Sequence, residues 1–142
     1  MKPITPRFFR ALLLASVLIA LASAAVDWLC PALLPLEWQM VQEETPLPWA
    51  PEDDTLWLLF GVVLGAYALA LSVATVGMYL FKPWGRSLSL WGTVLAAPVV
   101  VWLGPTMLSG LASALLDLSS MLWGATLALA YFSPLADRFA RA

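Results

Sequence analysis

Four long apolar segments divide the chain, and polar residues gather between them. Each segment has a centre free of Asp, Glu, Lys and Arg, and each is close to the length of about 20 residues that a helix needs to cross a bilayer. None alternates apolar and polar positions as membrane β-strands do. The pattern predicts an all-α integral membrane protein, a single four-helix transmembrane domain over 1–142 with an irregular outer loop at 30–55. The predicted spans are about residues 11–29, 56–81, 87–103 and 118–135.

The fourth segment admits two placements. A helix from Gly110 would carry Asp117 about 10 Å along its axis, and an acidic residue deep in lipid costs roughly 3 kcal/mol. A helix from Leu118 would use Asp117 as its N-cap instead, and residues 107–116 would form a short interfacial helix or a reentrant turn before it. We favour the second placement.

The basic residues sort the connecting segments by side. All seven lie before the first span, between the second and third spans, or after the fourth. Of the nine acidic residues, only Asp137 shares that side. Basic residues mark cytoplasmic loops, so we predict a protein of the bacterial inner membrane with both termini in the cytoplasm. Its basic segments are expected to meet anionic lipid headgroups.

The first segment has a second interpretation. A basic start, an apolar run and the sequence Ala22-Ser23-Ala24 are features of a cleavable secretory signal. Cleavage near Ala25 would leave three spans in the same orientation. The apolar run continues to Leu29, which favours a retained span.

The outer loop, residues 30–55, is acidic and interrupted by prolines. Residues 36–40 alternate as a short strand does, and a helical turn after Pro35 is the other possibility. The loop lacks the ligand spacing of a calcium-binding loop, so we interpret its carboxylates as solvated rather than as a metal or partner site.

Composition removes several classes of function. The chain has no histidine and one cysteine, Cys30, which excludes an imidazole base, a His-ligated metal and an internal disulfide. No glycine-rich phosphate loop is present. The net charge of −2 gives no indication of nucleic-acid binding. We therefore expect no cofactor and no enzymatic activity. We expect the lipid bilayer to be the main partner of the chain.

Small residues recur at helical spacing in all four segments. Such stripes lie on one helix face and permit close helix packing. The longest stripe belongs to the second segment and is a candidate face for packing, for a membrane-protein partner or for a second copy of the chain. It consists of Gly61, Gly65, Ala68, Ser72, Thr75 and Tyr79. The shorter stripes are Ser16, Ala20, Ser23 and Asp27; Gly85, Ser89, Gly92 and Ala96; and Asp117, Ser120 and Gly124.

Asp27 and Asp117 each end a stripe on the outer side. If those stripes face each other, the two carboxylates would meet at the outer mouth of the bundle, where repulsion would raise one pKa or a cation would be held. Two independent interfacial acids are the simpler interpretation. A separation beyond about 10 Å, a Debye length, would remove the pair.

Two short segments resemble parts of uncharacterised small bacterial membrane proteins with four spans. They are the turn Phe81–Arg86 (FKPWGR) and the ending Trp123–Leu135 (WGATLALAYFSPL). The resemblance implies this architecture and carries no activity. No ionisable residue lies at a span centre, and the first span lacks the Glu on which small multidrug exporters rely. We therefore expect an accessory, assembly or regulatory subunit, with a small oligomeric transporter or channel as the alternative.

Overall fold

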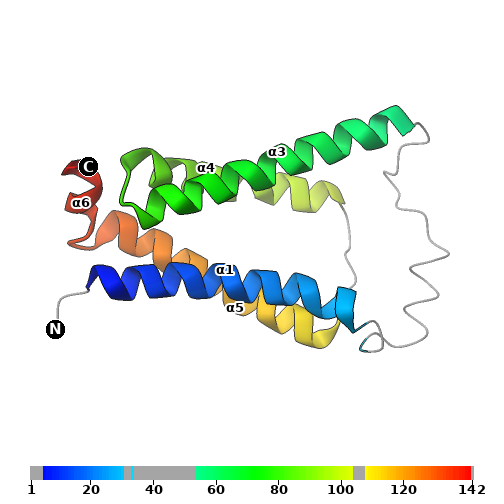
Figure 1. The fold of residues 1–142 in the computed structure, drawn as a ribbon, viewed down its shortest axis with the longest axis horizontal. Helices are drawn as coiled ribbons and strands as arrows, with labels where there is room; N and C mark the ends of the chain where they lie inside the picture. The colour runs from blue at the N-terminus through cyan, green and yellow to red at the C-terminus, as the bar shows by residue number, and fades with distance from the viewer. Residues whose placement is uncertain (1–4, 31–32, 34–53, 104–107, 142) are drawn as a thin grey trace.

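The computed structural model describes residues 5–30, 33, 54–103 and 108–141, and within these ranges the chain is all-helical. The all-α prediction is therefore confirmed for this part of the chain. Most of the predicted outer loop, including residues 36–40, lies outside the described residues. The described helices, labelled as in Figure 1, are α1 (Pro6–Leu29), α3 (Asp54–Tyr79), α4 (Pro83–Leu103), α5 (Gly110–Phe132) and α6 (Ala136–Arg141).

Three of these helices are long and apolar enough to cross a membrane: α1, the part of α3 from Gly61 to Tyr79, and α5. Between 17% and 22% of the positions in their most apolar windows are buried inside the molecule. Most of their apolar side chains therefore face outward, as a lipid environment requires. The helix α4 covers the third predicted span but is not among the three.

The helix α5 corrects the predicted start of the fourth span. It runs without a break from Gly110 to Phe132, and its N-cap is Ser109, whose hydroxyl accepts a hydrogen bond from the Ala112 N–H at 3.2 Å. Asp117 is therefore not a cap, and residues 110–116 belong to α5 rather than to a separate interfacial helix. A helix of 23 residues is about 35 Å long. It exceeds a hydrocarbon core of about 30 Å, so its first turn can project beyond the lipid.

The helix α1 also begins earlier than predicted. Thr5 caps it by accepting a hydrogen bond from the Phe8 N–H at 3.3 Å, and Pro6 occupies the first helical position. Proline is favoured there because its missing N–H would have no helical partner. The early start adds Arg7 and Arg10 to the helix.

A tight turn joins α3 to α4. The Phe81 N–H donates to the Met78 carbonyl at 3.1 Å, and the Lys82 N–H donates to the Gly77 carbonyl at 2.8 Å. These two bonds form a Schellman motif. Phe81 takes the left-handed position, with φ of 59°, which glycine usually occupies. Pro83 then starts α4.

The helices α1 and α5 pack as an antiparallel pair. The Ser119 hydroxyl donates to the Ser16 carbonyl at 2.8 Å, and the Ser23 hydroxyl donates to the Ala112 carbonyl at 2.7 Å. All four residues are buried. Small residues let the two backbones approach, and the hydroxyls then bond across the interface.

The helices α3 and α4 form the second antiparallel pair. A Cβ added to Gly85 would lie 2.6 Å from the Met78 nitrogen and 2.7 Å from the Gly77 Cα. The backbones therefore touch beside the turn, and only glycine fits there. Further along, the Tyr67 hydroxyl donates to the Gly92 carbonyl at 2.7 Å.

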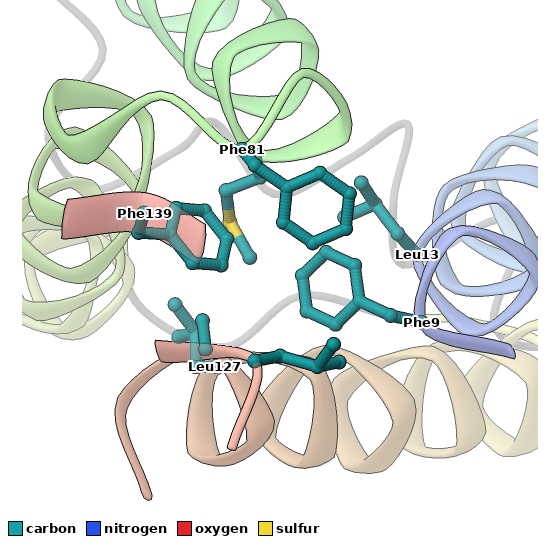
Figure 2. Packing of buried hydrophobic residues seen from close by; sticks show 8 residues of the cluster. Phe9, Leu13, Phe81, Leu127 and Phe139 are labelled. Carbon is teal, nitrogen blue, oxygen red and sulfur yellow. The ribbon is translucent and has the colours of Figure 1, made fainter. Parts of the chain in front are cut away.

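An aromatic cluster joins the two pairs at one end of the molecule. The rings of Phe9, Phe81 and Phe139 lie with their centroids 5.2–5.9 Å apart. Figure 2 shows them turned toward one another from α1, the α3–α4 turn and α6. All three are buried. We call this the basic end, because Arg10, Lys82 and Arg86 belong to the same segments.

Away from the basic end the two pairs part. Figure 1 shows α3 diverging from α1 toward the start of α3. Halfway along, the Trp123 indole N–H of α5 donates to the Thr93 hydroxyl of α4 at 2.8 Å. The first half of α3 is therefore not covered by α1.

Candidate functional site

The basic end holds Arg10 in a fixed position. Its Nε donates to the Tyr79 carbonyl at 3.1 Å, and its guanidinium carbon lies 4.7 Å from the Tyr79 ring centroid and 5.3 Å from that of Phe81. The side chain is half-buried. No carboxylate among the described residues pairs with it. Stacking on two rings and one hydrogen bond to the backbone thus orient the Arg10 guanidinium, and its other N–H groups can bind a further acceptor.

Arg86 is held in a similar way on the other side of the aromatic cluster. Its guanidinium carbon lies 5.0 Å from the Tyr131 ring centroid and 5.7 Å from that of Phe139. One terminal nitrogen lies 3.5 Å from the Ala130 carbonyl. The predicted gathering of basic residues on one side is consistent with these contacts, because Arg10 and Arg86 flank one cluster.

A groove of about 270 Å³ lies between α1 and α3, next to Arg10. Its lining is almost entirely apolar. The hydroxyl of its Thr75 is already bonded to the Leu71 carbonyl at 2.8 Å. The lining residues are Leu13, Leu14, Thr75, Val76, Tyr79 and Leu80.

The predicted small-residue stripe of α3 does not pack against α4. Nothing lies within 4 Å of a Cβ added at Gly61 or Gly65, and Ala68 and Ser72 are exposed. Thr75 and Tyr79, the last two members, line the groove toward α1. Because the six positions share one helix face, the stripe turns toward the side where α1 and α3 part. We call residues Gly61, Gly65, Ala68 and Ser72 the open face of α3.

The other stripes divide into those that pack and those that do not. On α4, Gly85, Ser89 and Gly92 are buried, as expected of a packing face. On α1, Ser16 and Ser23 are buried against α5. The predicted stripe of α5 is outward instead: Asp117, Ser120 and Gly124 are exposed. The face of α5 that packs consists of Ala112, Ser119, Thr126 and Ala130.

The structure separates Asp27 from Asp117. One oxygen of Asp27 accepts a hydrogen bond from the Ser109 N–H at 3.0 Å, so this carboxylate lies beside the start of α5. Asp117 is eight residues further along that helix, about 12 Å by axial rise, and is exposed. No described contact joins the two. Asp27 thus bonds the N–H of the N-cap residue, as the acidic residue of a capping box does, but from a neighbouring helix.

Within the part of the chain that the structure describes, no group of three or more His, Cys, Asp or Glu side chains is placed to hold a metal ion. Cys30 is exposed at the end of α1. No protein-family model matches the chain, and no significant match was found among curated proteins or solved structures.

Sequence reasoning missed three features of this region. Phe139 belongs to a six-residue helix, which is too short to show a period, although its spacing of four from the buried Leu135 is a weak signal. Phe81 was assigned to the end of a span and to the turn that follows it, and its burial in an aromatic cluster was not predicted. The stacking of Arg10 on α3 joins residues 69 positions apart, and no local pattern reports such a contact.

Proposed function

We propose that the chain is a four-span protein of the bacterial inner membrane that acts as a non-enzymatic accessory, assembly or regulatory subunit. The observation that carries this proposal is the open face of α3. It consists of small residues and is directed to the side where the helix pairs part, and a Cβ added at Gly61 or Gly65 would meet no atom of another described segment within 4 Å. A transmembrane helix of a partner protein is the occupant that such a face suits, since small residues allow close contact between helix backbones.

The four-span placement is supported by α4 and by the basic end. The helix α4 has 21 residues, about 32 Å of helix, which is enough to cross a hydrocarbon core of about 30 Å. Pro98 lies inside it, and proline is tolerated within membrane helices. The described start of α1, the α3–α4 turn and α6 lie at one end. A cytoplasmic basic end follows from the preference of basic residues for that side.

Site-specific crosslinking in native membranes tests the partner. In a Cys30→Ser background, Ala68→Cys places a thiol on the open face, while Ala66→Cys places the same thiol two positions away on the other side of the helix. Both alanines are exposed. We expect Ala68→Cys, and not Ala66→Cys, to crosslink to a different membrane protein.

Each other outcome decides against the proposal. A crosslink only between two copies of the chain would assign the face to a homo-oligomer, and solute movement by that oligomer in liposomes would establish the transporter alternative. Equal yields from both thiols would show that the face is simply covered by lipid. A reporter fused at Ala142 that registers outside the cytoplasm would refute the orientation.

A further inference from the structure

The groove between α1 and α3 has an apolar lining and a fixed cation at its end. We propose that it binds one acyl chain of an anionic phospholipid whose phosphate is held by Arg10. This inference rests on the membrane placement proposed above, with the basic end at the headgroup level. It does not require a partner protein, because the groove and the open face of α3 are at different levels of that helix.

The size and the lining of the groove favour a single acyl chain as its occupant. Its volume of about 270 Å³ lies below the range of roughly 300–1,000 Å³ that is typical of small-molecule pockets. Such a groove accepts one narrow segment rather than a bulky ring system. Leu14, Val76 and Leu80 offer exposed hydrocarbon to a bound acyl chain. The aliphatic hydroxyl in the lining, that of Thr75, is bonded within its own helix. A hydrocarbon chain leaves no polar group of the groove without a partner.

The position of Arg10 selects the headgroup. Arg10 lies one turn before Leu13 and Leu14, so the three side chains share a helix face. Its bond to the Tyr79 carbonyl ties the guanidinium to a residue that lines the groove. A guanidinium has five N–H donors in a planar fork, and the Tyr79 carbonyl takes one. The remaining donors suit a phosphate, which a guanidinium binds in a bidentate manner.

Arg86 shows that stacking alone does not create this site. It is held over Tyr131 and Phe139 much as Arg10 is held over Tyr79. No residue of α4 or α5 lines the groove, however. Of the two stacked arginines, Arg10 is the one that combines an oriented cation with an apolar groove. That combination matches an anionic amphiphile rather than a simple anion.

Native mass spectrometry of the full chain in a neutral detergent provides the test. The probes are phosphatidylglycerol, phosphatidylcholine with the same acyl chains, and inorganic phosphate. Arg10→Gln removes the charge at the groove, while Arg7→Gln removes the same charge from an exposed position one turn earlier on α1. Val76→Phe fills the groove, while Val62→Phe places the same side chain on an exposed part of α3 away from it. The retained helical content of each variant is checked by circular dichroism.

We expect the unmodified chain to hold phosphatidylglycerol about tenfold more tightly than phosphatidylcholine. Both lipids carry an anionic phosphate, but the choline cation of phosphatidylcholine offsets that charge and is repelled by Arg10. Arg10→Gln should abolish that preference. Arg7→Gln should stay within about twofold, because the Arg7 side chain is exposed to solvent and has no described contact with the residues that line the groove. Val76→Phe should weaken both lipids, and Val62→Phe neither.

Three results would overturn the inference. Equal losses from Arg10→Gln and Arg7→Gln would indicate diffuse surface charge. Displacement of phosphatidylglycerol by inorganic phosphate, with Val76→Phe silent, would indicate a simple anion site. If Arg10→Gln does not fold, equal lipid retention by Val76→Phe and Val62→Phe would show that the groove is not the lipid-binding site. A reporter that contradicts the orientation would refute the membrane placement separately, and failed crosslinking of Ala68→Cys would refute only the partner.

Discussion

Phe81 combines an unfavourable backbone conformation with a buried ring, and the two contributions can be separated by mutation. An L-residue in the left-handed region costs roughly 1–2 kcal/mol relative to its usual conformations, whereas glycine adopts the region freely. The ring is 6% exposed and lies 5.3 Å from the Phe9 centroid and 5.2 Å from the Phe139 centroid. Packing of the Phe81 ring in the cluster therefore stabilises the turn, although the left-handed backbone conformation of Phe81 destabilises it.

Phe81→Ala and Phe81→Gly both delete the ring, but only the alanine retains the backbone penalty. Deleting a buried Phe from a soluble core costs about 3–5 kcal/mol. We expect about 3 kcal/mol for Phe81→Ala, because lipid also shelters the ring in the unfolded reference state. Phe81→Gly should recover about 1 kcal/mol of that loss.

Thermal and denaturant unfolding in mild detergent, followed by circular dichroism, measures these differences. Phe132→Ala is the control, because Phe132 is 90% exposed and its ring contributes nothing to the cluster. Equal stability of Phe81→Ala and Phe81→Gly would mean that the left-handed conformation carries no cost. Destabilisation of Phe132→Ala as large as that of Phe81→Ala would mean that burial in the cluster is not the source of the loss.

Three further substitutions test the helix contacts. Gly85→Ala should destabilise the α3–α4 pair by about 1–3 kcal/mol, because a Cβ there meets backbone; Gly124→Ala, with open space around it, should be neutral or stabilising in the same unfolding assay. Ser119→Ala should cost about 0.6 kcal/mol through loss of its bond across to α1, and Ser120→Ala, bonded only within α5, should cost less. Asp27→Ala should cost about 1 kcal/mol and accelerate hydrogen exchange in the first turn of α5, since it removes the acceptor of the Ser109 N–H; unchanged exchange there would contradict this role.

The helices that the sequence predicted best are those with the simplest patterns. The second predicted span, 56–81, differs from α3 by two residues at each end, because polar residues border an uninterrupted apolar run. The start of α5 was wrong by eight residues, since the prediction placed Asp117 at a lipid border. The structure instead gives α5 a cap at Ser109, whose N–H is bonded by Asp27 of α1. That tertiary contact has no local sequence signature.

The faces of the helices were harder to predict than their bounds. Gly85 and Gly61 look alike in sequence, each within a stripe of small residues, yet a Cβ at Gly85 meets backbone and one at Gly61 meets nothing. Spacing establishes that residues share a face, and only the packed neighbours decide whether that face is occupied. The stripe of α5 failed for the same reason, because Ser119 packs and the adjacent Ser120 does not.

The divergence of the helix pairs gives the molecule the mechanics of a lever. The helix α3 is 26 residues long, about 39 Å, with its C-terminal end at the aromatic cluster. A rotation of about 10° around that end would move its first turn by about 7 Å. The Trp123–Thr93 hydrogen bond links the two pairs away from the cluster. A small shift among the three phenylalanine rings would therefore be amplified several-fold at the first turn of α3, and the Trp123 indole N–H bond would oppose separation of the two pairs.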